Sequence, residues 1–298
     1  MDQFKLKVGV APEYQITRKN FEEQTLKKTP YVQKERNRIS NYAVCPKCDN
    51  PIQIVGLQKN TSEAGRKPYG RHNKGSIANL AMYSEIDYQD CPFSNPSWKK
   101  SSGKRPAGSP LANKMLTTMK SEFDIIIKIM RQKTDLGISR NLARKMLENY
   151  MLDEGWLYRQ ATLNNLPWIL GESSPAIPLF GQFIKRESGL YQAIHTNCEQ
   201  VVLEASPLTD NYVQIRNKPG EFINLSFIFY NHHQGIINDG MQESIDFLVF
   251  GKNQEHVDVE IFRKTIPITE NDLIAAIQKY GTNFRDESLL EIAKEIID

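Results

Sequence analysis

Three cysteines and one histidine in the N-terminal half of the chain have the types and the spacing of metal ligands. Cys45 and Cys48 are separated by two residues, His72 follows after 23 residues, and Cys91 follows after 18 more. Thiolate sulfur and imidazole nitrogen are the ligands that zinc prefers, and four of them complete a tetrahedron. The sequence therefore predicts a zinc site formed by Cys45, Cys48, His72 and Cys91. Because four protein ligands leave no position for water, we expect this zinc to be structural.

Several basic residues lie close to these ligands in the sequence. Three thiolates around a divalent ion leave one net negative charge, and Lys47, Arg71 and Lys74 are placed to offset it. Few apolar residues lie between positions 58 and 76, so this stretch has little material for a core of its own. We therefore expect its folding to depend on the metal.

The segment Cys45-Pro46-Lys47-Cys48 resembles the Cys-Pro-x-Cys knuckle of zinc-ribbon and treble-clef proteins, and the resemblance covers residues 45–91 only. Knuckles of those families commonly place glycine after the second cysteine. This chain has Asp49-Asn50 there, and either residue can adopt the left-handed conformation at some cost. His72 followed by Cys91 is not a standard second pair, so the subtype stays open. The resemblance implies binding to nucleic acid or to a protein partner.

Cys45 and Cys48 have an alternative interpretation as a redox pair or as simple buried thiols. A redox Cys-x-x-Cys usually opens a helix after a strand. The residues that follow, Asp49-Asn50-Pro51, disfavour a helix at this point. The sequence therefore favours metal binding over redox chemistry.

Charge is distributed unevenly along the chain. Residues 1–150 contain 27 Lys and Arg against 14 Asp and Glu, whereas residues 151–298 contain 11 against 21. A basic half of this kind predicts contact with a polyanion. The alternative is that the two halves attract each other, within one chain or between two copies.

Basic residues close to aromatic ones are typical of surfaces that bind nucleic acid. Such residues occur between the metal ligands and after Cys91, and a further group follows Ser139, a candidate N-cap of a helix. The alternative for that helix is an ordinary helix hairpin with a solvated outer face. The predicted contacts to DNA or RNA are Arg66, Lys67, Arg71, Lys74, Lys99, Lys100, Arg140 and Arg144.

Hydrophobic periodicity changes along the chain. From about residue 113, apolar residues recur at steps of three and four, which predicts one helix before Gly137 and a second that begins after Ser139. In the C-terminal part, apolar residues alternate with polar ones, which predicts strands. The expected strands lie at 200–205, 212–216, 221–229, 244–250 and 257–261, and the expected last helices at 270–280 and 287–297.

These patterns predict an α+β fold with a small N-terminal zinc module, a helical middle segment and a C-terminal mixed α/β domain. The expected division is a basic arm at 1–40, a zinc-binding module at 41–96, a flexible basic linker at 97–112, a helical region at 113–170 and an α+β domain at 171–298.

Motifs that would indicate an enzyme are absent from the sequence, including the phosphate-binding loop, the dinucleotide fingerprint and the zinc-protease helix. The sequence also lacks a secretory signal and any apolar run of about 18 residues, so we expect no membrane contact and a cytoplasmic location. The expected function is therefore that of a non-enzymatic zinc-binding protein whose basic half contacts nucleic acid.

Two other functions remain open. One is an interaction or assembly module, in which opposite charges on the two halves bind a protein partner or a second copy of the chain. The other is an enzyme with its active site in the C-terminal domain, using His195 near Cys198, or His232 and His233. A polar turn after a strand explains His232 and His233 equally well.

Overall fold

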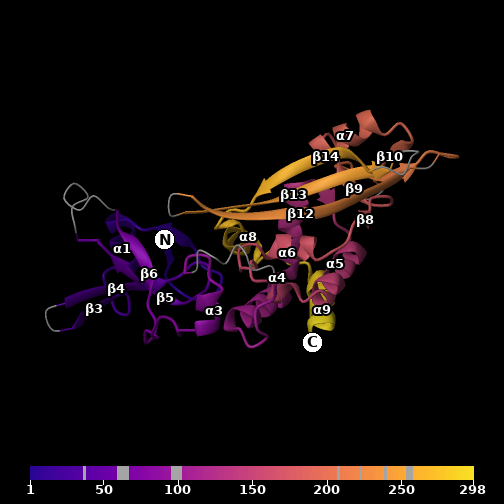
Figure 1. Cartoon of the computed structure of the whole chain (residues 1–298). Helices are drawn as coiled ribbons and strands as arrows, with labels where there is room; N and C mark the ends of the chain where they lie inside the picture. The colour runs from indigo at the N-terminus through magenta and orange to yellow at the C-terminus, as the bar shows by residue number, and fades with distance from the viewer. Residues whose placement is uncertain are drawn as a thin grey trace.

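The computed structural model describes most of the chain and contains both helices and antiparallel sheets. It has the α+β fold that the sequence predicts. Figure 1 shows a small body of N-terminal strands beside a larger body with the remaining helices and the long C-terminal strands. None of the helices in the described part of the chain combines the length and the apolar character needed to cross a membrane. The described residues are 1–35, 38–58, 67–94, 103–206, 209–221, 223–237, 240–252 and 258–298.

The smaller body, which we call the N-terminal module (residues 1–94), is built on one sheet. Its strands run in the order β2-β1-β4-β5-β6, and β3 also pairs with β4. The strands are β1 (Gln3–Lys5), β2 (Glu13–Gln15), β3 (Val32–Glu35), β4 (Arg38–Val44), β5 (Pro51–Val55) and β6 (Tyr69–His72). Its helices are α1 (Arg18–Thr25), which Thr17 caps, and α3 (Glu85–Gln89), which Ser84 caps.

Residues 1–40, expected to form a basic arm, are part of this module. Strand β1 pairs with β4, so the sheet continues across residue 40. Phe4 and Phe21 are buried in the same core as Ile52 and Ile54. Apolar residues are few in this stretch, but Phe4, Ile16 and Phe21 are buried in one core that the metal-site cysteines complete.

The larger body, residues 103–298, begins with three helices. Helix α4 (Pro110–Thr134) starts at the cap Ser109, and α5 (Arg140–Leu152) starts at Ser139, whose side chain accepts a hydrogen bond from the Leu142 amide. The two predicted helices and the predicted Ser139 cap are confirmed. A short 3-10 helix, η2 (Gly155–Leu157), and α6 (Leu166–Glu172) follow.

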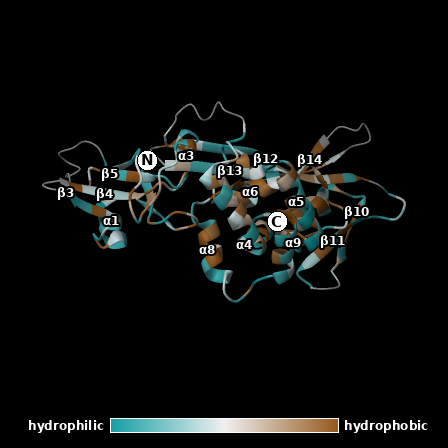
Figure 2. Ribbon diagram, turned by 90° about the horizontal axis from the view of Figure 1, so that it is seen from below, coloured by the Kyte–Doolittle hydropathy of each residue, from teal (hydrophilic) through white to brown (hydrophobic). Residues whose placement is uncertain are grey.

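Two antiparallel sheets form the rest of the larger body. One has the order β14-β13-β12-β8 and the other the order β10-β11-β9-β7. Figure 2 shows apolar and polar bands alternating along the long strands, as expected for a sheet with one buried face. The strands are β7 (Leu136–Gly137), β8 (Ile177–Pro178), β9 (Phe183–Lys185), β10 (Val201–Ala205), β11 (Tyr212–Asn217), β12 (Asn224–Ile237), β13 (Gly240–Lys252) and β14 (Asp258–Pro267). The helices are α7 (Gly189–Asn197), α8 (Asp272–Tyr280) and α9 (Glu287–Ile297).

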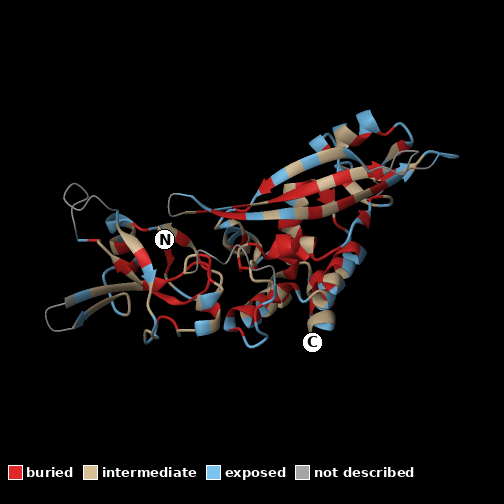
Figure 3. Ribbon diagram, viewed as in Figure 1, coloured by how far each residue is buried: buried red, intermediate tan, exposed pale blue. Residues whose placement is uncertain are grey.

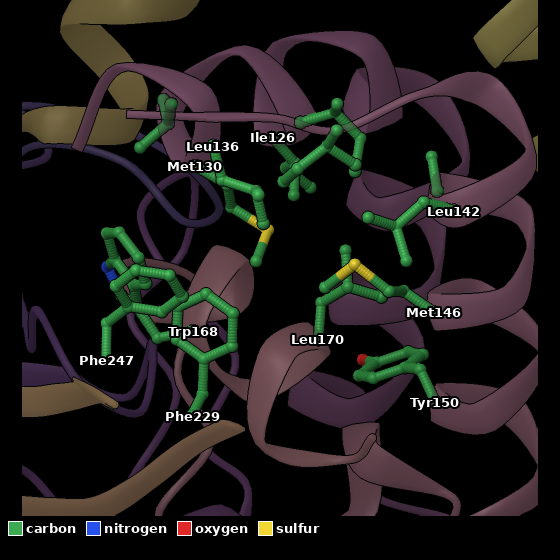
Figure 4. Packing of buried hydrophobic residues seen from close by; sticks show 14 of the residues in the cluster. Ile126, Met130, Leu136, Leu142, Met146, Tyr150, Trp168, Leu170, Phe229 and Phe247 are labelled. Carbon is green, nitrogen blue, oxygen red and sulfur yellow. The ribbon is translucent and has the colours of Figure 1, made fainter. Parts of the chain in front are cut away.

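One hydrophobic core joins the expected helical region to the expected α+β domain. Met130 and Met146 from the helices and Phe229 and Phe247 from β12 and β13 belong to the same buried cluster, with Trp168 between the two groups (Figure 4). Figure 3 shows the buried residues concentrated where the helices meet the sheet. Strand β7 also lies in the helical region and pairs with β9. The described residues between 113 and 298 are therefore one packed unit.

Residues 97–112 were expected to form a flexible linker. Residues 97–102 lie outside the described part of the chain, and residues 103–112 are packed against the rest of the larger body. Arg105 is buried, and its guanidinium donates hydrogen bonds of 2.8–3.0 Å to the carbonyls of Tyr158, Arg159 and Ala161. Ser109 is also buried and caps α4. A basic side chain from a polar segment is thus buried here, where its guanidinium donates hydrogen bonds to three backbone carbonyls.

The opposite charges of the two halves pair within the chain. Basic residues of α4 and α5 form ion pairs with acidic residues at α8 and α9. The pairs are Lys120 with Asp298, Lys133 with Asp272, Arg140 with Asp286, and Arg144 with Glu295. Part of the charge asymmetry seen in the sequence is therefore used inside one molecule.

Candidate metal centre

The turn between β4 and β5 presents Cys45 and Cys48 on the same side. The Cys45 amide donates to the Asn50 carbonyl at 2.8 Å, and the Asp49 amide donates to the Cys45 carbonyl at 3.2 Å. Asp49 has φ 60°, the left-handed conformation expected at this position in place of glycine. Its carboxylate is anchored by the Gly9 amide at 2.8 Å and by Lys114 at 2.7 Å. These contacts explain how a non-glycine residue is held in that conformation.

His72 and Cys91 reach this turn from two different elements. His72 ends β6 and lies opposite Ile52 of β5, so sheet register places it beside the turn. Cys91 follows α3. The Asn50 side chain attaches the start of α3 to the turn, because its Oδ1 accepts from the Ser84 amide at 2.6 Å and its Nδ2 donates to the Ser84 carbonyl at 3.1 Å.

The four ligand atoms come together as the sequence predicts. The Sγ atoms of Cys45 and Cys91 are 3.8 Å apart, and Cys48 Sγ is 3.3 Å from His72 Nε2. All four atoms lie within 4.8 Å of one another, and the three cysteines are buried. The arrangement is compatible with a bound metal ion. The turn leads into strand β5 and not into a helix, unlike the usual redox Cys-x-x-Cys.

The electrostatics of the three thiols differ. Burial raises the pKa of the Cys48 thiol and the pKa of the Cys91 thiol, both well above the usual range of cysteine. Burial acts in the same direction on Cys45, but hydrogen bonds from the other two thiols, together with His72, outweigh it and bring the pKa of Cys45 well below its usual range. Binding of a metal ion would release protons from these thiols, because cysteine binds a metal as the thiolate.

Of the three cations expected to offset the charge of the site, Lys47 does not do so, and that expectation is wrong. Its side chain turns toward the larger body and pairs with Glu13 at 3.4 Å, with both side chains buried. Lys74 lies over the ring of Tyr88 at 4.9 Å, and that ring packs edge-on against His72. Arg71 donates to Gln53 Oε1 at 2.8 Å. The presence of a lysine close to a metal ligand in the sequence does not show in which direction its side chain points.

The predicted nucleic-acid contacts fall into separate groups. Lys67, Arg71 and Lys74 are exposed on or beside β6. Arg140 and Arg144 lie on the α5 surface that faces α9, where they pair with Asp286 at 3.2 Å and Glu295 at 2.7 Å, far along the chain from the metal ligands. The remaining residues, Arg66, Lys99 and Lys100, lie outside the described part of the chain.

Sequence reasoning missed a polar row across the sheet. Tyr42, Gln53 and Arg71 occupy paired positions on β4, β5 and β6, so their side chains share one face. Ala43 and Ile52 point to the opposite, buried face. Alternation in the sequence around residues 51–55 is the signal for such a face, but the pairing of strands that are far apart in the chain is not visible in it.

The candidate histidines of the C-terminal domain lie in different surroundings. His195 is exposed and stacks on Tyr191 with ring centroids 5.9 Å apart, whereas Cys198 is buried in the core. The residues His232 and His233, expected in a turn, lie inside β12 at an irregularity of its pairing with β13. His232 is held by the buried carboxylate of Glu243 at 2.6 Å.

Comparison with known proteins gives no relative from which a function could be transferred. The metal centre and the fold are therefore interpreted from their own geometry. No protein-family model matches the chain, and no curated protein or solved structure matches it.

Proposed function

We propose that the protein binds one structural zinc ion through Cys45, Cys48, His72 and Cys91. Zinc with Zn–S bonds of about 2.3 Å and Zn–N bonds of about 2.0 Å keeps its tetrahedral ligand atoms roughly 3.5–3.8 Å apart. The separations of 3.8 Å between two sulfurs and 3.3 Å between sulfur and nitrogen are close to those values. Soft thiolate ligands favour zinc over magnesium or calcium.

The zinc would act on folding and not on a substrate. Four protein ligands fill the tetrahedron, so no position is left for a reacting water. The ion would connect three separate pieces of chain: the β4–β5 turn, the end of β6 and the end of α3. Thiolate ligands stay reduced in the cytoplasm, which we propose as the location of the protein.

We further propose that the protein is not an enzyme and that the N-terminal module binds DNA or RNA. The observation that carries this proposal is one side of the module's sheet, which we call the β4–β6 face: Tyr42, Gln53, Val55 and Tyr69 are half-buried there, and Arg71 is exposed. Aromatic rings on a sheet can stack with bases, and arginine can contact phosphate. Lys67 and Lys74 flank the same strand, β6, and add positive charge.

Assembly through opposite charges is the weaker alternative. The pairs between α4 or α5 and the acidic C-terminal helices satisfy many of these charges within one chain. Less charge is then left to attract a protein partner or a second copy. Self-association driven by charge would appear in light scattering as an oligomer that dissociates as salt increases.

The test is binding of labelled single-stranded and duplex DNA and RNA by the full chain across a salt series. We expect salt-sensitive binding that Arg71→Ala weakens, with a smaller salt slope, because one phosphate contact is lost. Arg140→Ala is the matched control, since it removes an exposed arginine that is paired with Asp286. If binding is absent at about 50 mM salt, where phosphate contacts are strong, or if both variants bind alike, the β4–β6 face is not the site.

A further inference from the structure

A cavity of about 300 Å³ lies in the larger body, where the end of α6 meets β12. Its lining includes Tyr158, Arg159, Ile169, Glu172 and His232. This volume is at the lower end of the range for sites that bind small molecules. The cavity is separate from the metal centre and takes no part in the function proposed above.

His232 is fixed in the wall of this cavity by a buried carboxylate. Its Nε2 is 2.6 Å from Glu243 Oε1, and the two side chains are only 2% and 4% exposed. The same oxygen accepts hydrogen bonds from the amides of Asn165 at 2.6 Å and Gln234 at 2.7 Å. Burial acts to raise the pKa of Glu243, but His232, Lys47 and Gln234 outweigh it and lower that pKa, which keeps the carboxylate ionised.

The tautomer of His232 follows from this contact. An ionised carboxylate can only accept hydrogen bonds, so Nε2 carries the hydrogen in this contact, and in the tautomer with its single hydrogen on Nε2 the Nδ1 atom is an acceptor. Glu172 Oε2 lies 3.9 Å from Nδ1, which is too far for a hydrogen bond between them but close enough for one donor to bridge both. Two acceptors therefore converge at the cavity wall.

Glu172 contributes an acidic side chain to the lining of this cavity. Among the described residues, His232 is the only basic group within ion-pair distance of Glu172. Arg159, the cation in the lining, is paired with Asp90 at 3.4 Å. Burial raises the pKa of Glu172, His232 lowers it through its charge and a backbone hydrogen bond, and Asp153 raises it, so that burial prevails and a bound cation would favour the ionised carboxylate.

We propose that this cavity binds a small ligand through a primary ammonium group, which donates to Glu172 and to His232 Nδ1. The carbon skeleton of the ligand would pack against Ile169 and the Tyr158 ring, which are both in the lining. An ammonium has three donors and a positive charge, and so matches Nδ1 and the Glu172 carboxylate, which lie 3.9 Å apart. An anionic ligand would instead meet the Glu172 carboxylate at close range.

The test uses three probes of similar size on the full-length protein: n-butylammonium, butyramide and butyrate. Isothermal titration calorimetry should show the ammonium binding at least about tenfold more tightly than the neutral or the anionic probe, because a hydrogen bond to a charged group is involved. No detectable binding of n-butylammonium at about 10 mM would overturn the proposal, as would equal affinities for the three probes.

The variant Glu172→Gln keeps the shape of the wall and removes its charge. We expect it to weaken binding of n-butylammonium by roughly tenfold to a hundredfold, while binding of the neutral probe stays unchanged. Glu204→Gln is the matched control, since Glu204 is half-exposed on β10 and pairs with Arg216 at 2.8 Å. If Glu172→Gln binds the ammonium as tightly as the Glu204→Gln control, the assignment of Glu172 is wrong.

Discussion

Replacing Cys48 with serine will unfold the N-terminal module while the larger body stays folded. The module's core contains few apolar residues, and the sulfurs of Cys45, Cys48 and Cys91 are part of it. A structural zinc site contributes on the order of 10–16 kcal/mol of apparent binding free energy in small domains. The larger body has a separate and more extensive core, so it does not depend on the metal.

Hydrogen–deuterium exchange with mass spectrometry measures this effect by segment. We expect fast exchange in residues 38–58 and 67–94 of the Cys48→Ser variant, and unchanged protection in α4, α5 and α9. Cys198→Ala is the matched control, because Cys198 is a buried cysteine of the larger body and no metal ligand. Protection of β4, β5 and β6 equal to that of the wild type would mean that the module does not need the metal.

Replacing Lys47 with methionine will destabilise the protein by about 3–5 kcal/mol, since it leaves a buried carboxylate without its partner. Lys47 and Glu13 are 2% and 1% exposed and lie 3.4 Å apart. Burial acts to lower the pKa of Lys47, but the carboxylates of Glu13, Glu243 and Glu270 outweigh it and raise that pKa. The ammonium is therefore a counter-charge to several carboxylates from both bodies.

The location of this pair makes its effect specific. Glu13 also contacts the larger body, because its amide donates to Asn271 Oδ1 at 3.0 Å and its carboxylate accepts from Asn164. Urea unfolding of Lys47→Met should show the loss, whereas the control Arg18→Met should lose no more than about 1 kcal/mol. Arg18 is 59% exposed in its pair with Glu22. Equal losses in the two variants would show that the buried Lys47–Glu13 pair contributes no more to stability than an exposed pair.

The metal-site residues could be predicted because the chemistry depends on residue type and short spacing. Cys45 and Cys48 belong to one turn, and their two-residue separation is visible in the sequence. His72 and Cys91 followed as the other cysteine and histidine of the N-terminal half. The α+β class, the helices α4 and α5 and the C-terminal strands were also predicted, because the periodicity of apolar residues reports a buried face directly.

The features that could not be predicted depend on contacts between distant residues. The pairing of β1 with β4 brings residue 5 beside residue 44, and no local sequence pattern in residues 1–40 predicts this pairing. Arg140 and Asp286 are 146 positions apart, so a count of charges could not show that they neutralise each other. Arg105 is buried against carbonyls of residues 158–161, more than 50 positions further along the chain.

Elemental analysis of the chain purified without added metal tests the central claim most directly. We expect close to one zinc ion per wild-type molecule and almost none in Cys45→Ser, since the four ligand atoms within 4.8 Å act as one set. A wild-type protein that contains no metal, and yet shows β4, β5 and β6 protected from exchange, would contradict it.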